Sequence, residues 1–281
     1  MSSRLKREIR HICSTLSIPL LGCAPAERWE IPLFEPWVPE EFRPASIVPE
    51  TKTVIVIGMP VSLPAVETSP SIWYHEEYRT VNTLLDTNAY RIAALLNTKG
   101  YPSVALPRDG YGHISVLRER PVAFFSHRHA AFLAGLGNFG VNNVLLTREF
   151  GPRVRFTSIF SAATIPPDPV LEDPLCTRCM RCVRICPVHA LPGKDYPDGL
   201  TDKQACATRS EELLRDYVSP CGFCIKVCPV GDDRKLYRRE TMEIYDERKK
   251  KFKGLHRAWR HVRNYGGGER APGVINKPTP G

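Results

Sequence analysis

The sequence predicts an α+β protein in which an α/β layer domain comes first and a small cysteine-rich domain follows. Between residues 53 and 106, two short apolar runs flank a long helical pattern, as in a strand–helix–strand unit. Eight of the ten cysteines then fall between Cys176 and Cys228. We divide the chain into an N-terminal helix and Pro-rich segment (1–50), the α/β domain (51–165), the cysteine-rich domain (166–240) and a basic C-terminal tail (241–281).

The N-terminal segment begins with an amphipathic helical pattern, because Leu5, Ile9, Ile12 and Leu16 recur on one face. Residues 20–23 faintly resemble a lipoprotein cleavage site, but polar residues interrupt the apolar stretch before them, which makes a poor signal peptide. The chain has no apolar run of about 18 residues, the length of a membrane span. We therefore expect a cytoplasmic protein with no membrane partner.

Short apolar runs of different periodicity build the α/β domain. Residues 53–59 predict a fully buried strand, 76–99 a helix that Gly100 ends, and 103–106 a second strand. We interpret these three elements as a βαβ unit. Downstream, 127–137 predicts a short helix, and a glycine-rich loop leads into a strand at 144–147. The alternating residues 154–160 predict a further strand, and Pro-rich residues 165–169 a linker.

The cysteines of the second domain are spaced as ligands of two iron–sulfur clusters. The first run reads C-x2-C-x2-C-x3-C-P, the spacing of bacterial two-cluster ferredoxins, and holds Cys176, Cys179, Cys182 and Cys186. The second run holds Cys221, Cys224 and Cys228 before Pro229, with Val218 at the place of a first cysteine. The isolated Cys206 can replace that cysteine from a preceding segment.

The fourth cysteine of such a run ligates the other cluster, so we assign two sets of four ligands. The first set is Cys176, Cys179, Cys182 and Cys228; the second set is Cys186, Cys206, Cys221 and Cys224. The alternatives are zinc, whose sites use C-x2-C pairs with a long gap, and disulfides, which need an oxidising compartment. The two sets predict a ferredoxin-like domain that carries two [4Fe-4S] clusters and transfers electrons.

The net charge of +9 is concentrated near the C-terminus, where twelve Lys or Arg lie between Arg234 and Arg263. Such a tail predicts an acidic protein partner or a nucleic acid such as tRNA. The alternative is a solvated helix face after the cluster domain, with the apolar residues Ile244, Phe252, Leu255 and Trp259 docking the helix.

Residues 134–146 read A-G-L-G-N-F-G-V-N-N-V-L-L. With the isolated Cys206 and the cysteine order, this segment resembles epoxyqueuosine reductase and the corrinoid-dependent reductive dehalogenases over roughly residues 50–235. The resemblance implies a nitroreductase-like, cobalamin-binding α/β domain beside a ferredoxin-like module. It also implies that a loop approaches the corrin through Gly135, Leu136, Gly137, Gly140 and Asn142. Glycines allow such an approach, but Gly135 and Gly137 can also simply end a helix.

The sequence departs from the family pattern at three positions. Asn138 stands where the family has tryptophan, Val141 where it has lysine, and Pro121 in the register of its proton-donating aspartate. Activity on the tRNA nucleoside is therefore in doubt. Candidate replacement acids are His127 and His129 before the loop, and Tyr74 and His75 at the start of the long helix.

These features support two hypotheses. The first is an oxidoreductase resembling epoxyqueuosine reductase, in which two clusters pass electrons from a ferredoxin or flavodoxin to a cofactor, cobalamin by resemblance, or to a substrate on the α/β domain. The alternative is a non-catalytic, ferredoxin-like electron-transfer or reductive-activation partner of another protein. The missing aspartate and Val141 favour the second hypothesis.

Overall fold

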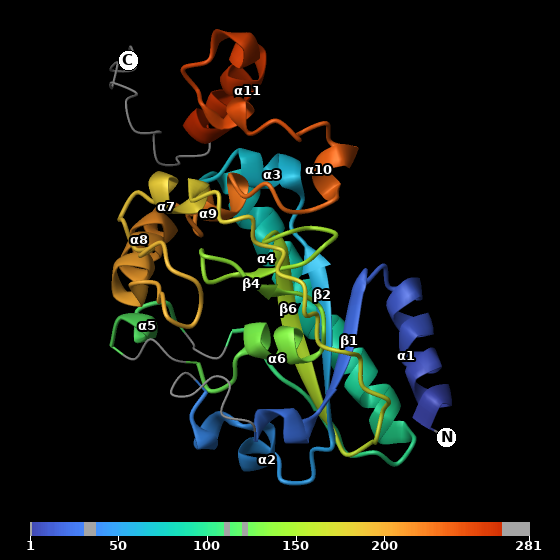
Figure 1. The fold of residues 1–281 in the computed structure, drawn as a ribbon. Coiled ribbons are helices and arrows are strands. Elements are labelled where there is room, and N and C mark those ends of the chain that lie inside the picture. The colour runs from blue at the N-terminus through green and yellow to red at the C-terminus, as the bar shows by residue number, and fades with distance from the viewer. Residues whose placement is uncertain (1, 31–37, 110–112, 120–122, 266–281) are drawn as a thin grey trace.

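The computed structural model describes residues 2–30, 38–109, 113–119 and 123–265 and confirms a mixed α+β fold (Figure 1). Its first part contains α1 (Ser2–Thr15), β1 (Leu20–Pro25), η1 (Ala26–Trp29), η3 (Glu40–Phe42), α2 (Pro44–Ile47), β2 (Thr53–Pro60), α3 (Leu63–Glu67), α4 (Ile72–Thr98), β3 (Ser103–Ala105), α5 (Val116–Glu119), α6 (His127–Leu133), β4 (Asn138–Phe139), β5 (Leu145–Leu146) and β6 (Val154–Ser161). The second part contains α7 (Arg181–Ile185), α8 (Lys203–Arg215), α9 (Phe223–Lys226), α10 (Asp233–Leu236), η4 (Met242–Tyr245), η5 (Lys250–Phe252) and α11 (Lys253–Tyr265).

The main sheet has the order β1-β2-β6-β3, and each neighbouring pair of strands is antiparallel. The predicted strands of the βαβ unit are present as β2 and β3, and α4 joins them. They do not pair with each other, because β6 lies between them and pairs with both, Ile55 facing Ile159 on one side. The βαβ interpretation was therefore wrong about adjacency. The edge strand β1 was not predicted.

The sheet is covered on both faces (Figure 1). Ile55 and Ile57 of β2 pack with residues of α1 and α4, whereas Val54 and Val56 pack with residues of α6. This explains why β2 is apolar at successive positions rather than alternating. Burying each isoleucine contributes about 1.5–3 kcal/mol. The sheet is the rigid support on which α4 and α6 are held.

Helix α4 begins earlier than the predicted residue 76. The Ser71 hydroxyl caps it by accepting a hydrogen bond from the Tyr74 N–H at 3.1 Å. Gly100, with φ of 81°, follows its end as predicted. The earlier start places Tyr74 and His75 in the first turn, where both are buried.

The segment after β6, predicted as a linker, is anchored to the first helix. Lys6 Nζ donates to Asp168 Oδ1 at 2.8 Å, and the Cys23 N–H donates to Asp168 Oδ2 at 2.9 Å. Because Ile165 is also buried, this segment packs on the α/β layer. It then leads to the cysteine runs at the end of the molecule where α7 packs against α9.

The C-terminal segment also packs on the protein. Ile244 and Trp259 are buried, as the docked-helix alternative predicts, while Phe252 and Leu255 are half-buried. Helix α11 contacts α4. Pro121 and the end of the tail (266–281) lie outside the described residues. Among those described, no helix combines the length and the apolar character needed to cross a bilayer.

Candidate iron–sulfur site

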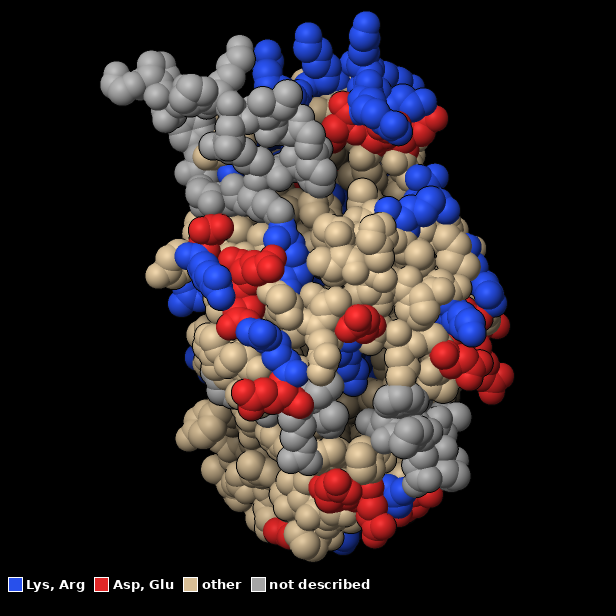
Figure 2. All heavy atoms as spheres, turned by 90° about the vertical axis from the view of Figure 1, so that its left-hand side faces the viewer, with Lys and Arg blue, Asp and Glu red and all other residues tan. Residues whose placement is uncertain are grey.

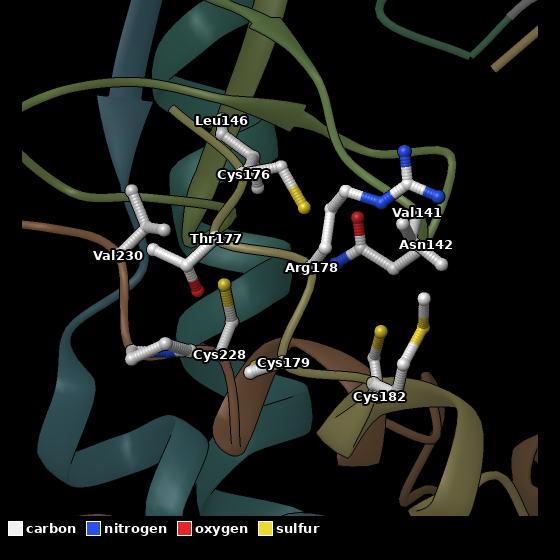
Figure 3. Close-up of a pocket in the computed structure, with 12 residues that line it drawn as sticks. Val141, Asn142, Leu146, Cys176, Thr177, Arg178, Cys179, Cys182, Cys228 and Val230 are labelled. Atoms are coloured by element: carbon white, nitrogen blue, oxygen red, sulfur yellow. The ribbon is translucent and has the colours of Figure 1, made fainter. Parts of the chain in front are cut away.

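The first cysteine set surrounds one cavity (Figure 3). The cavity is lined by Cys176, Cys179, Cys182 and Cys228, by their neighbours Thr177, Arg178, Met180, Pro229 and Val230, and by Val141, Asn142 and Leu146 of the β4–β5 hairpin. The sulfur atoms of Cys176 and Cys228 point into the space between them. The two cysteine runs therefore meet, although about fifty positions separate Cys228 from the other three ligands in the sequence.

The loop of the first run is held in a conformation that suits wrapping. Arg178 and Met180 have φ of 51° and 56°, a left-handed conformation that costs non-glycine residues roughly 1–3 kcal/mol. Met180 immediately precedes α7, and Arg184 of that helix donates to the Cys179 carbonyl at 2.9 Å. The two left-handed residues turn the chain around the cavity. Such strain persists only where surrounding contacts hold it.

The second cysteine set also lies together. Burial and, after it, the neighbouring thiols of Cys221 and Cys186 raise the pKa of Cys206 to about 11. Burial also raises the pKa of Cys224, and the neighbouring thiols of Cys221 and Cys206 raise it to a smaller extent. Cys206 reaches the other three from α8. A cysteine at Val218 would instead lie in the core, because Val218 is fully buried at the end of that helix.

Two sets of four thiols fit two [4Fe-4S] clusters, which cysteine thiolates hold in this number. Since thiols of raised pKa are protonated near neutral pH, cluster assembly would release protons. Within the described ranges, no three His, Cys, Asp or Glu side chains are placed to hold a single metal ion.

Asparagines of the β4–β5 hairpin tie the cluster segments to the α/β layer. The Asn138 side chain donates to the Asp173 carbonyl at 2.6 Å and accepts from the Leu175 N–H at 2.9 Å, just before Cys176. Asn143 donates to the Gly199 carbonyl and accepts from the Thr201 N–H, just before α8. In the sequence, Asn138 stood out only as a departure from the family pattern, and no motif pointed to Asn143.

Two buried arginines hold the other run. Arg234 Nε donates to the Cys228 carbonyl and Nη2 to the Lys226 carbonyl, each at 2.7 Å. Arg153, which immediately precedes β6, donates to the Val230 carbonyl and pairs with both carboxylate oxygens of Asp233. Both guanidinium groups thus fix the backbone beside Cys228. Neither was a sequence candidate, because a lone basic residue gives no signal.

The residues of the predicted corrin loop are explained largely by packing within the chain. A Cβ on Gly135, which has φ of 75° and follows α6, would lie 2.0 Å from the Pro169 carbonyl oxygen, and one on Gly137 would lie 1.9 Å from the Leu146 oxygen. Leu136 packs partly on the core. Gly140 contacts Asn142, which lines the cysteine cavity. These residues form no cradle for a corrin, and the cobalamin contacts remain a prediction from resemblance.

The histidines predicted as acids on α6 are neutral and hydrogen-bonded. Burial lowers the pKa of His127 to about 4; its Nε2 donates to the Pro107 carbonyl and its Nδ1 accepts from the Ser158 hydroxyl, each at 2.9 Å. Burial lowers the pKa of His129 to about 3, and its nitrogens hydrogen-bond with the Ser126 and Tyr196 hydroxyls. These bonds position the helix. Because both imidazoles are neutral near pH 7, neither carries the extra proton that a general acid would donate.

We expect His129 to make stability depend on pH. Its pKa is about 3 in the folded protein against an ordinary 6.5, so the unfolded chain binds more protons between these values. Stability should therefore be constant above this window and fall as the pH drops through it, by at most about 1.4 kcal/mol per pH unit. When the free energy of unfolding is measured with urea at several pH values in this range, its slope against pH should be shallower for His129→Gln than for the parent protein. Identical slopes in variant and parent would contradict the assignment.

The other two candidates contact the second cysteine run. His75 Nδ1 donates to the Ser219 carbonyl at 2.5 Å, so it positions the segment before Cys221. The Tyr74 ring packs beside Gly222, where a Cβ would lie 2.9 Å from it. Burial raises the pKa of Tyr74 well above its ordinary value, with the Cys224 thiol among the further causes. The four predicted acids thus lie in two groups and form no single site.

A polar cluster that the sequence did not reveal continues from Tyr74. The Tyr74 and Tyr78 rings meet edge to face with centroids 6.1 Å apart. The Arg155 guanidinium lies 4.7 Å from the centre of the Tyr78 ring and donates to Asn82 and Asp109, each at 3.0 Å. Burial raises the pKa of the Tyr78 phenol, while Arg155 opposes that rise. The phenol is protonated at neutral pH and is a candidate acid.

Comparison with known proteins supports the cluster domain. A family model described as a 4Fe-4S binding domain matches residues 171–191. A tetrachloroethene reductive dehalogenase of Desulfitobacterium hafniense is 28% identical over 193 residues, which cover 63% of this chain and 32% of the dehalogenase. An epoxyqueuosine reductase of Pseudomonas aeruginosa is 26% identical over 203 residues, covering 66% and 53%. The chain thus spans about a third to a half of the length of these relatives.

Solved structures show the same fold. The catabolic reductive dehalogenase NpRdhA superposes with a TM-score of 0.62 at 17% identity, covering 95% of this chain and 38% of its own. Epoxyqueuosine reductase from Bacillus subtilis superposes with a TM-score of 0.55 at 17% identity, covering 82% and 66%. The homologues of this chain are therefore reductive dehalogenases and epoxyqueuosine reductases at moderate identity, and the solved structures share its fold.

Proposed function

We propose that this protein is an iron–sulfur oxidoreductase that passes single electrons through two [4Fe-4S] clusters to an acceptor held beside Tyr78 and Arg155. One observation carries the proposal: neighbouring residues lead from the second cysteine run to that polar cluster. Tyr74 lies against Gly222 between Cys221 and Cys224, Tyr78 lies against Tyr74, and Arg155 lies over Tyr78. The second cluster would therefore be the one nearest the acceptor.

The polar cluster has groups suited to a reduction. The Tyr78 phenol holds a proton at neutral pH and can transfer it to a reduced acceptor. Arg155 and Arg108 bring two positive charges, and Asp109 and Asp86 hold them in place. The Arg155 and Asp109 side chains are 27% and 28% exposed, so solvent and small molecules reach them.

Cobalamin is the acceptor that the relatives suggest. A solved reductive dehalogenase with a TM-score of 0.61 is described in terms of B12-dependent dehalogenation. In this chain the glycines expected beneath a corrin are instead packed against the chain's own backbone. The described residues supply no corrin cradle there, so no residue of this loop is assigned a role toward cobalamin.

A second candidate is an electron-transfer or reductive-activation protein with no substrate of its own. The packing of Gly135 and Gly137 against the chain's own backbone favours this candidate, because an electron-transfer protein needs no cofactor site at this loop. Both functions require the clusters, and they differ in whether the α/β layer binds an acceptor.

Titrating anaerobically reconstituted protein with cob(II)alamin tests the cobalamin form of the oxidoreductase. This form predicts binding at micromolar concentration, with a base-off electron paramagnetic resonance spectrum. Tyr78→Phe should leave both clusters intact, and any change it makes in the cobalamin spectrum would place the corrin near the polar cluster. Full cluster reduction without cobalamin binding would reject the cobalamin form.

A further inference from the structure

The C-terminal segment presents a basic face, which we define as Lys250 and Lys251 of η5 with Lys253 and Arg257 of α11. All four side chains are exposed. None of them has an acidic partner among the residues that the structure describes. Lys and Arg atoms gather at this end of the molecule (Figure 2). Such an unpaired group of positive charges attracts anionic partners over about a Debye length.

The opposite side of α11 fixes the basic face in place. His256, Trp259 and Arg263 are 1%, 4% and 2% exposed. His256 Nε2 donates to the Ile244 carbonyl at 2.6 Å, and Arg263 pairs with Glu247 at 2.7 Å. The face is therefore held on an ordered helix, as a specific docking surface needs.

Direct contacts link α11 to the first cysteine set. Trp259 stacks on Tyr245, with centroids 5.7 Å apart and planes 10° apart. Arg234 donates to the Tyr245 hydroxyl at 2.8 Å and to the Cys228 carbonyl at 2.7 Å. A partner on the basic face would thus lie over the end of the molecule that holds Cys228. Tyr74 lies beside the second set instead, so the two cysteine sets face different neighbours.

We propose that the basic face docks a small acidic electron-carrier protein, which reduces the cluster held by Cys176, Cys179, Cys182 and Cys228. This rests on the proposed function, because it presumes the clusters. In the step, one electron leaves the carrier and the oxidised cluster gains it, with no bond or proton exchanged. The first cluster would then be the entry point and the second the exit. Opposite charges across such an interface speed the encounter more than they tighten the complex.

A protein fits this face better than a nucleic acid does. Single-stranded nucleic acids bind where aromatic rings stack on bases beside positive charges. Here Trp259 is buried against Tyr245, and Phe252 is half-buried and contacts the His256 ring. The basic face therefore offers charge with little aromatic surface for stacking.

The test is stopped-flow reduction of the reconstituted full-length chain by flavodoxin hydroquinone. The variant Lys250→Glu/Lys251→Glu/Lys253→Glu reverses three charges of the face. Its matched control, Arg7→Glu/Lys52→Glu/Arg91→Glu, reverses three exposed charges on α1, at the start of β2 and on α4. We expect the second-order rate to fall at least about tenfold in the first variant and little in the control. The parent rate should also fall as salt is added.

Reduced methyl viologen, a small cation, separates the inference from the proposed function. Viologen should reduce parent and variants alike. Clusters that viologen cannot reduce would reject the proposed function itself. Normal reduction by viologen, together with equal flavodoxin rates in both variants, would overturn the docking proposal alone. Loss of tRNA binding in the first variant without any change in the flavodoxin rate would overturn it as well and assign the face to nucleic acid.

Discussion

Cys206→Ala is expected to remove one iron–sulfur cluster and leave the other in place. In our assignment Cys206 supplies the fourth thiol of the second set from α8, and the two cysteines outside both sets, Cys13 and Cys23, lie buried in α1 and β1. The iron content of anaerobically reconstituted protein should fall from about eight to about four atoms per chain. The cluster that survives should keep its own spectrum, because Cys176, Cys179, Cys182 and Cys228 still line their cavity.

Two further variants make this result specific. Cys13→Ala changes a buried cysteine of α1 that belongs to neither set, and it should leave the iron content unchanged. Cys176→Ala should remove the first cluster and spare the second. Loss of both clusters in Cys206→Ala and in Cys176→Ala alike, or of neither, would contradict two separate ligand sets.

Asp233→Ala is expected to destabilise the protein by about 3–5 kcal/mol, because it leaves a buried charge without its counter-ion. The Arg153 side chain is 0% exposed and donates to both Asp233 oxygens, at 2.9 and 2.5 Å. After the substitution, this guanidinium would keep the Val230 carbonyl as its acceptor. The midpoint of urea unfolding should fall markedly with an unchanged slope.

The neighbouring Asp232→Ala is the matched control. Asp232 pairs with Lys235 at the surface, and exposed pairs contribute little, so its unfolding midpoint should hardly move. Replacing both partners together, as Arg153→Met/Asp233→Leu, should cost less than Asp233→Ala alone, since neither charge then stays buried unpaired. Equal midpoints for Asp233→Ala and Asp232→Ala would show that the buried pair does not support the segment beside Cys228.

Local patterns were sufficient to predict much of the main sheet. The β-branched run at 53–59 became β2, the helical spacing became α4, and the alternating residues became β6. Which strands pair was not predictable, because β6 reaches its place between β2 and β3 through contacts distant in sequence. The edge strand β1 was missed since Gly22, Ala24 and Pro25 are poor strand formers, and pairing with β2 decides its conformation.

The cysteines were predictable because cluster geometry dictates their spacing. The residues that support them were not. Arg153, Arg234 and Asn138 act through hydrogen bonds to backbone carbonyls, which leave no periodic trace in a sequence. Gly135 and Gly137 show the converse problem, because a glycine needed for close packing gives the same sequence pattern as one that approaches a ligand.

Two clusters, each held by four cysteines, are central to the proposed function, and metal analysis of the anaerobically reconstituted chain tests for them most directly. Iron and acid-labile sulfide should each approach about eight per chain. Electron paramagnetic resonance of the reduced protein should show two interacting [4Fe-4S] centres. A fully folded preparation that holds zinc and no sulfide would contradict the account.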